Sequence, residues 1–242
     1  MPADSATYFV TSILPYVAVI VFVDGLLYRL LSWMRRPRAA TRFTIYPAAS
    51  SLIRALPRLL GDIVLFPRLL REEKALWIGA WLFHLSLLMT AVSHYKVFFS
   101  YMWLWEGLGV SQATFQLASN AFDGATGGVM TASLLFLLVR RFPKFLRKLS
   151  DPEDYLVLLL LLVISISGIY LRFISSTNLL ELRRYFQSLA AFSPSNLPGD
   201  PVFLAHYLLV LTLMIYFPLG KMAHTVGAGL TSRLIRLGSR YD

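Results

Sequence analysis

The four histidines of the chain are its clearest candidates for chemistry, because all of them lie in or beside apolar stretches. His84 and His94 are ten residues apart within WLFHLSLLMTAVSHYKVFF, and His206 and His224 are eighteen residues apart further along the chain. A polar side chain in hydrocarbon costs several kcal/mol unless it is paired or ligated. Two pairs of imidazoles therefore indicate ligand sites, whereas a single imidazole would be explained as well by a hydrogen bond to a neighbouring helix.

Membrane helices must position these histidines. Of the 242 residues, 57% are hydrophobic and 15% are charged, which is typical of an integral membrane protein. We expect an all-α bundle of transmembrane helices that forms a single membrane domain over residues 1–242. Windows of about twenty apolar residues predict five spans, near residues 9–31, 76–98, 121–139, 155–173 and 202–220.

Two segments outside the spans carry their own patterns. Residues 35–74 contain LIRALPRLLGDIVLFPRLL, in which arginines and prolines interrupt the apolar residues. This pattern predicts short amphipathic helices on the membrane or on a partner, and not a sixth span. Residues 174–201 are predicted to form the connection between the fourth and fifth spans, with one short helix in LLELRRYFQSLAAF.

The basic residues predict the orientation in the membrane. Nineteen of the 23 Lys and Arg residues fall in three segments, namely 29–74, 140–148 and 221–240, which would share one side of the membrane. The positive-inside rule then places the N-terminus outside and the C-terminus in the cytoplasm. Because the basic residues gather at the ends of apolar spans, the net charge of +10 is explained by this topology and not by nucleic-acid binding.

Depth in the membrane predicts how the histidines pair. Since the second and fifth spans would run antiparallel, His94 would pair with His206 near the outer face and His84 with His224 near the inner face. Zinc prefers three or four protein ligands, whereas a haem iron needs only two axial side chains. The chain has no cysteine and therefore no CxxCH motif, so the pattern favours two haem b groups held without covalent attachment.

These spacings, with LPYVAVIVFVDG, FDGATGG and IYFPLGKMAH, resemble the membrane γ subunit of respiratory nitrate reductase over nearly the whole chain. The resemblance implies a di-haem cytochrome b of the cytoplasmic (inner) membrane that exchanges electrons with a quinone, menaquinone or ubiquinone. It also implies that all four histidines are iron ligands. Such a chain would be an electron-transfer subunit of an oxidoreductase complex and not a complete enzyme.

Other motifs are similar to the cytochrome b subunit of the sulfite-reduction-associated Dsr complex. They are FPRLL followed by EKALWIGAWLFHLSLL, then LSDPEDYLVLLLLL and YFPLGKMAH. This similarity implies sulfur metabolism and a cytoplasmic iron–sulfur partner related to heterodisulfide reductase, with further membrane and periplasmic subunits. One departure is that VSQATFQLASNAFDG lacks the lysine that serves the quinol pocket of the γ subunit.

Several further residues have two interpretations each. Asp123 is a candidate proton acceptor for quinol chemistry, or is a helix-cap acid. Lys96 is a candidate cation for the same chemistry, or is an interfacial lysine. Gly124 would let a porphyrin approach the backbone, or is a helix-contact glycine. Arg140 and Arg141 would bind propionates of the inner haem, or only anchor the helix end.

Asp24 is the only carboxylate deep in the first span. We expect it to pair with Arg29 or with a hydrogen-bond network of the haem ligands, in preference to carrying protons. A rival interpretation of the whole chain is a small proton-coupled transporter that relays protons through its intramembrane His and Asp residues. Transporters of that kind usually contain an internal repeat, and none is evident in this sequence.

Overall fold

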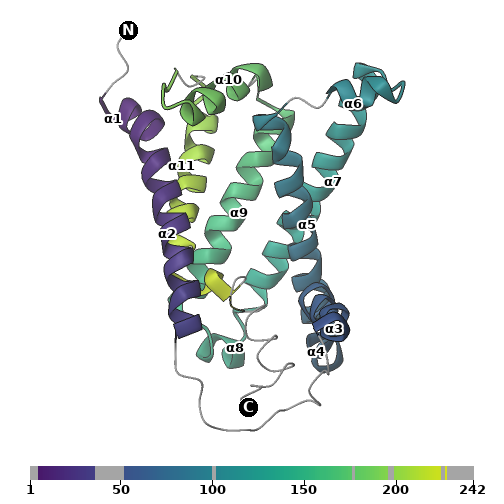
Figure 1. Cartoon of the computed structure of the whole chain (residues 1–242). Coiled ribbons are helices and arrows are strands. Elements are labelled where there is room, and N and C mark those ends of the chain that lie inside the picture. Colours follow the sequence, from purple (N-terminus) through teal and green to yellow (C-terminus); the bar gives the residue numbers. More distant parts are fainter. Residues whose placement is uncertain are drawn as a thin grey trace. The chain divides into compact units, whose positions relative to one another are not determined.

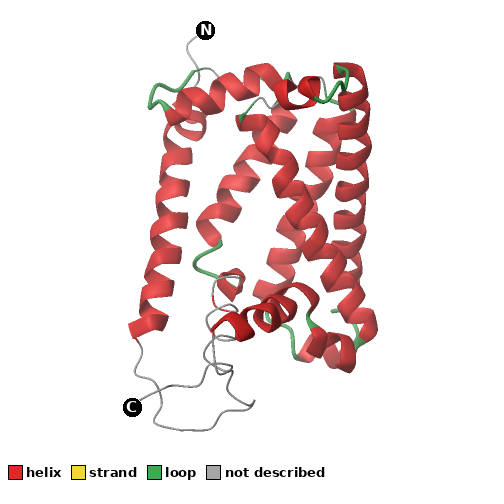
Figure 2. Ribbon diagram, turned by 45° about the vertical axis from the view of Figure 1, so that its right-hand side comes forward, coloured by secondary structure: helices red, strands yellow, loops and turns green. Residues whose placement is uncertain are grey.

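The computed structural model describes residues 5–35, 52–99, 102–175, 178–195, 199–224 and 227. Over these residues the chain is helical and contains no strand, which confirms the all-α prediction (Figure 2). The chain divides into two compact units. The first unit contains the described residues up to Tyr16 and those within Gly79–Leu213. The second unit contains the described residues within Val17–Ile78 and those from Met214 onward.

Among the described residues, four helical stretches are long and apolar enough to cross a membrane. The first is Phe9–Arg35, which consists of the π-helix η1 (Phe9–Ile13) and the helix α2 (Leu14–Arg35). The other three are the helices α5 (Lys74–Phe98), α7 (Gln112–Val139) and α9 (Pro152–Phe173) (Figure 1). Each contains one of the first four predicted spans, although α7 begins nine residues earlier than predicted. Ser111 explains this early start, because its hydroxyl accepts a hydrogen bond from the Thr114 amide as an N-cap.

The fifth predicted span is shorter than expected. Helix α11 covers Pro201–Tyr216, and its 16 residues rise only about 24 Å, against a hydrocarbon core of about 30 Å. The helix ends before Phe217 because a residue that precedes proline disfavours helical backbone, and Pro218 follows. His224 comes directly after the short 3-10 helix η2 (Lys221–Ala223) and not within α11. A fifth membrane crossing and the direction of the termini therefore stay predictions.

In the first unit, α9 packs closely against α7. A side chain at Gly127 would place its Cβ 3.0 Å from Ile169 Cγ1, so the glycine permits the two helices to approach. The hydroxyls of Thr131 and Ser165 are 2.7 Å apart in the same interface. These contacts fix the height and rotation of α9 against α7.

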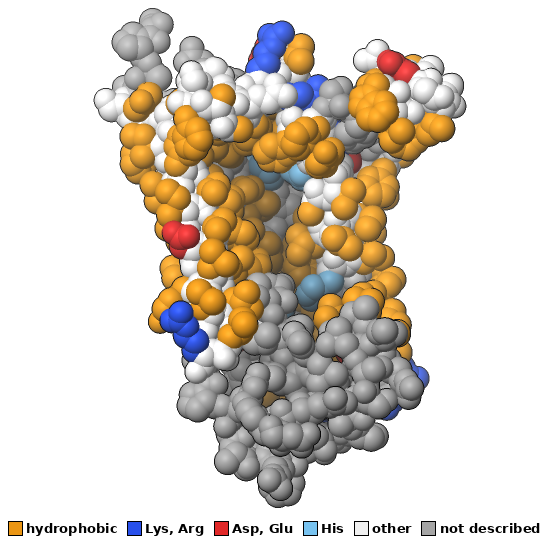
Figure 3. All heavy atoms as spheres, viewed as in Figure 1, with side chains coloured by type: hydrophobic (Ala, Val, Ile, Leu, Met, Phe, Trp, Pro, Cys, Tyr) orange, Lys and Arg blue, Asp and Glu red, His pale blue; other side chains and the backbone are white. Residues whose placement is uncertain are grey.

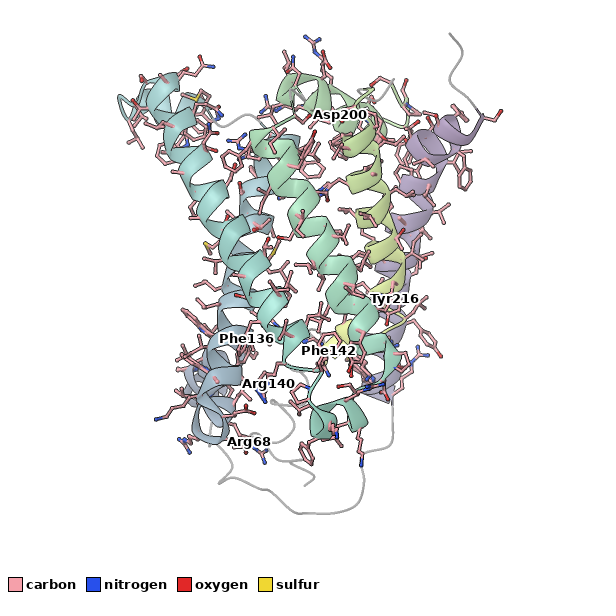
Figure 4. The ribbon with its side chains drawn as sticks, turned by 180° about the vertical axis from the view of Figure 1, so that it is seen from behind. Arg68, Phe136, Arg140, Phe142, Asp200 and Tyr216 are labelled. Carbon is pink, nitrogen blue, oxygen red and sulfur yellow. The ribbon has the colours of Figure 1, made fainter. Side chains whose placement is uncertain are left out.

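The connection between α7 and α9, which contains α8 (Lys144–Lys148), is also held at defined points. Asp151 and Asp154 form a capping box at the start of α9. Arg141 donates to Asp154 and to Ser150 at 3.1 Å, and the Tyr155 hydroxyl donates to the carbonyl of Arg141 at 2.9 Å. Figure 4 shows Arg140 and Phe142 beside this connection.

The short helix predicted after α9 is confirmed as α10 (Leu179–Ala190). Its Tyr185 is fully buried, and the hydroxyl donates to the Thr11 carbonyl at 2.6 Å, with the Tyr207 hydroxyl 3.2 Å away. Burial raises the pKa of the Tyr185 phenol, so the group stays a neutral donor at physiological pH. Helix α1 (Ser5–Tyr8) precedes η1. Tyr185 of α10 therefore contacts both η1 and α11 through its hydroxyl.

Two further features complete the first unit. Helix α6 (Met102–Gly107) precedes α7, and Trp105 of α6 packs against Phe115 with ring centroids 5.6 Å apart. Asp200 caps the start of α11, where its carboxylate accepts from the amides of Val202 and Phe203 (Figure 4). The cap sets where α11 begins and thereby the height of His206.

In the second unit, α2 packs against the segment that follows α11. Phe22 and Phe217 have ring centroids 5.4 Å apart, and a side chain at Gly25 would clash with Pro218. Arg29 donates a hydrogen bond to the Leu219 carbonyl. The side of α2 that carries these three residues is therefore its packed side.

The second unit also contains α3 (Leu52–Leu65) and α4 (Pro67–Glu72), which lie within the predicted amphipathic segment 35–74. Phe66, between them, has a left-handed φ of 46°, and Pro67 begins the next helix. The Trp77 indole donates to the Leu65 carbonyl at 2.6 Å and connects α3 to the start of α5. Residues 36–51 of that segment, and most of the predicted basic segment 221–240, lie outside the described residues.

Candidate functional site

His84 and His94 both project from α5, and each is held by its own helix. The Nδ1 atom of His84 lies 2.7 Å from the carbonyl oxygen of Ala80, one turn earlier, and that of His94 lies 2.7 Å from the carbonyl of Thr90. His224 follows the same rule after η2, with Nδ1 2.9 Å from the Lys221 carbonyl. A carbonyl oxygen can only accept, so Nδ1 carries the proton in all three rings.

The Nδ1 atom of His206 also carries the proton, but its acceptor is a side chain of another helix. Its Nδ1 lies 2.9 Å from the hydroxyl of Ser167 on α9, and that hydroxyl donates its only proton back to the carbonyl of Val163 at 2.8 Å. Since the proton of Ser167 is used, its oxygen accepts from His206, and Nδ1 again carries the proton. The ring lies beside Gly168 of α9, where a Cβ would be 3.4 Å from His206 Cε1, an ordinary van der Waals distance.

All four histidines therefore have the tautomer of a metal ligand. With Nδ1 protonated and bound to an oxygen, the lone pair is on Nε2, and the ring orientation is fixed from behind. This arrangement is what a histidine ligand needs before any metal arrives. Figure 3 shows pale-blue imidazoles among apolar side chains.

The structure brings two of the four histidines together. His94 and His206, on α5 and α11 of the first unit, are close enough to interact electrostatically. This proximity agrees with the predicted outer pair. His224 belongs to the second unit, so the pairing of His84 with His224 stays a prediction.

Asp123 of α7 stands at the centre of a charged cluster. Its carboxylate forms ion pairs with Lys96 of α5 and with Arg172 of α9, whose Nε lies 2.9 Å from Oδ2, and it accepts a hydrogen bond from Ser93. The side chains of Lys96, Asp123 and Arg172 are only 13%, 12% and 22% exposed. Ser119 also accepts from both cations, at 3.1 and 3.2 Å. With two cations and one anion, the cluster has a net charge of +1 and connects three helices.

This charged cluster faces away from the His94 ring. A helix advances about 100° per residue, so Lys96 and His94 project about 160° apart around α5. Ser93 lies on the side of Lys96, toward α7. Arg183 of α10 donates to the backbone carbonyl of Lys96 at 2.9 Å and brings a further cation to the same end of the helices.

Comparison with known proteins identifies the family. Residues 68–234, more than half of the chain, match the family described as nitrate reductase gamma subunit. The chain belongs to this family. It is 28% identical to the Hdr-like menaquinol oxidoreductase cytochrome b-like subunit of Archaeoglobus fulgidus, over 89% of this chain and 75% of the relative. The protein of the same name from Archaeoglobus profundus is 27% identical, over 88% and 74%.

A third relative is the nitrate reductase gamma chain of Bacillus subtilis, which is 25% identical over 88% of this chain and 87% of its own length. Membership of the nitrate reductase gamma subunit family confirms the resemblance drawn from the histidine spacings. Together with the four apolar helices, it shows that the chain is a multi-pass membrane protein.

The remaining predicted site residues have structural partners. Arg141 is engaged by Asp154, so a haem propionate would compete with this ion pair. Arg140 is the C-cap residue of α7 and has contacts of its own. A Cβ at Gly124 would be 3.0 Å from the Phe173 ring, so this glycine permits a helix contact with α9, and its porphyrin role stays a prediction.

Sequence reasoning missed two residues of the site. Ser167 looks like any small residue of an apolar span, and Arg172 looks like an ordinary cation at the end of its predicted span. Ser167 lies 39 residues from His206 and Arg172 lies 49 residues from Asp123, so no short motif joins either pair. The available signal was the polarity of both side chains within or at the end of a predicted membrane helix.

Replacing Asp123 by Asn should destabilise the protein, because Lys96 and Arg172 would stay buried without their shared anion. Removing one partner of a buried ion pair costs about 3–5 kcal/mol, and the partial exposure places the expected loss near the lower value. Thermal unfolding in detergent would measure it. The control is Glu72→Gln, which breaks the exposed pair with Arg68 and should change stability by less than about 0.5 kcal/mol. Equal melting temperatures for the two variants would contradict a structural role of the cluster.

Proposed function

We propose that this chain is the membrane electron-transfer subunit of a respiratory oxidoreductase complex and that it holds two b haems. The observation that carries the proposal is the common tautomer of the four histidines, with Nδ1 bound to an oxygen and the lone pair on Nε2. Its family and the name cytochrome b-like subunit of two relatives support it.

The donor set fits a haem better than a bare metal ion. The described residues contain no group of three or more His, Cys, Asp or Glu side chains that could hold a metal ion. An axial pair of imidazoles suffices for a haem iron. His94 and His206 would hold the outer haem, and His84 and His224 the inner one. Each bound haem would supply reversible one-electron transfer, whereas the chain supplies ligands, orientation and exclusion of water.

We infer that the electron donor or acceptor in the membrane is a quinone, since two relatives are named menaquinol oxidoreductase subunits. The species would be menaquinone or ubiquinone. Lys96 and Asp123 stay our candidates for its site at the outer ends of α5 and α7. The net charge of +1 in their cluster would stabilise negative charge on a quinone oxygen, and Asp123 would accept a proton.

On the other side, we propose a cytoplasmic iron–sulfur subunit as redox partner, related to heterodisulfide reductase as the prefix Hdr-like of two relatives suggests. The N-terminus would be outside and the C-terminus cytoplasmic, with five membrane crossings that include α11. Exposed Phe142, Phe145 and Leu149 beside the basic residues of α8 offer such a partner both apolar area and charge. A role in sulfur metabolism belongs to the same proposal.

The histidine assignment predicts which variants lose the same haem. Purified protein should contain two haems per chain with low-spin b-type spectra. His94→Ala and His206→Ala should both lose the outer haem, and His84→Ala and His224→Ala the inner one, as judged by redox titration of the haem that remains. If His84→Ala and His94→Ala lost one common haem, the pairing would be wrong. Protein with no haem at all in any preparation would support the rival transporter interpretation.

The contact between Ser167 and His206 predicts a side chain that tunes the outer haem alone. Ser167→Ala should remove the acceptor for Nδ1–H, weaken the ligand field of His206 and change the reduction potential and low-spin EPR signal of the outer haem. Haem affinity should fall about 10-fold or more. Ser167→Thr keeps the hydroxyl and should restore both signals.

Ser165→Ala is the matched control for this experiment. Ser165 is buried on the same helix and bonds to Thr131 and not to a histidine, so its loss should lower stability and change the signals of the outer haem far less than Ser167→Ala does. Identical EPR signals for Ser167→Ala and the wild type would remove Ser167 from the ligand shell.

The quinone assignment is tested by kinetics on fully loaded protein. Asp123→Asn removes the carboxylate base, and quinol-driven haem reduction should slow at least about tenfold, which corresponds to roughly 1.4 kcal/mol of barrier. Asp123→Glu keeps the base and should retain most of the rate. Stopped-flow reduction, normalised to haem content, separates this effect from loss of stability. Unchanged kinetics in haem-loaded Asp123→Asn protein would exclude Asp123 from the quinone reaction.

A further inference from the structure

Asp24 is an exposed carboxylate in the interior of a membrane-spanning helix. It belongs to the apolar stretch Phe9–Arg35, about 22 Å from one end and about 16 Å from the other along the helix. Its side chain is exposed, and its short stem cannot reach the membrane surface as a lysine or arginine does. Figure 3 shows acidic atoms in red that are surrounded by apolar side chains in orange. A charge at such a depth is costly and indicates a partner.

The expected partners within the chain do not take this role. Arg29, which the sequence suggested, donates to the Leu219 carbonyl. Over the residues that the structure describes, Asp24 has no hydrogen bond and no ion pair. None of the four histidines uses it either, since each Nδ1 is bound to a carbonyl or to Ser167. The predicted pairing with Arg29 is therefore wrong.

Helix geometry separates the Asp24 side of α2 from its packed side. Three residues of α2 face the segment after α11, namely Phe22, Gly25 and Arg29. At about 100° per residue, they project about 100–160° away from Asp24. Ala18, which is fully buried, projects about 120° away. Val21, about 60° from Asp24, is half-buried, whereas five large apolar residues within about 60° of Asp24 are exposed. We call them, with Asp24, the Asp24 face: Val17, Ile20, Leu27, Tyr28 and Leu31.

We propose that the Asp24 face binds a transmembrane helix of another subunit and that a basic side chain of that helix, Lys, Arg or His, pairs with Asp24. The proposal rests on the proposed function, in which the chain is one subunit of a complex. Apolar residues along the whole face match the surface of a membrane helix, and the single carboxylate supplies the charge that selects a basic partner.

Charge excludes the simpler occupants of this face. A second copy of the chain in a two-fold contact would place two carboxylates opposite one another in hydrocarbon, where like charges repel strongly. Acyl chains of lipid cover apolar residues but provide no counter-charge for Asp24. A basic side chain on a neighbouring helix satisfies both the apolar surface and the carboxylate.

The test is photo-cross-linking in the membranes of the producing organism. A photoreactive benzophenone amino acid at Ile20 or Leu27 should cross-link a transmembrane segment of a different protein that carries a basic residue at the same depth. The same amino acid at Phe22, on the packed side, should give no such product. Cross-links only to lipid, or only to a second copy of this chain, would overturn the proposal.

Charge exchange makes the assignment specific. Asp24→Lys should lower the amount of co-purified partner at least tenfold, and changing the cross-linked basic residue of the partner to Asp should restore it. Ile20→Leu, which keeps the face apolar, should have no effect. Haem content and spectra of Asp24→Lys should stay as in the wild type, so the result is independent of the haem proposal. Retention of the partner by Asp24→Lys, or loss of haem from this variant, would contradict the proposed interface.

Discussion

The cost of leaving a polar group unpaired in hydrocarbon is the constraint on which this structure depends. The apolar helices satisfy their own backbone groups, so the side chains that matter are the few polar ones within them. The histidines, and the serines described within these helices, bond to a carbonyl one turn earlier, to a side chain of a neighbouring helix, or to both. At the histidines this pairing occupies Nδ1.

His206 shows what this constraint adds when a second helix is involved. Three histidines are oriented by their own backbone, which no substitution can remove, whereas His206 depends on the hydroxyl of Ser167. The ring of His206 is therefore sensitive to the position of α9, and α9 is in turn positioned by α7 through Gly127, Ile169 and the Thr131–Ser165 bond. The orientation of the His206 ring therefore depends on how α7, α9 and α11 pack.

Much of this arrangement could be predicted because it is local. Apolar runs of sufficient length predicted four membrane helices, and the amphipathic stretch after α9 predicted α10. The end of α11 was misplaced by four residues because its apolar pattern continues past Tyr216, although Pro218 carried the stop signal. The partners of Asp123 and His206 could not be predicted, nor that Asp24 has none among the described residues, since contacts depend on helix rotation, and a rotation of one residue turns a side chain by about 100°.

Helix α9 contacts both the charged cluster and the His206 ring, with different sides of the helix. Ser165, Ile169 and Arg172 fall within about 60° of one another and face α7, whereas Ser167 projects about 160° away from Ser165 and bonds to the His206 ring. Arg172 holds the outer end of this helix to Asp123, and Asp123 holds α5 through Lys96. Because α5 carries His94 and α9 supports His206, the carboxylate of Asp123 connects both helices that determine the separation of these two rings. A cluster that faces away from the histidines can therefore set the geometry of their site by fixing the helices behind them.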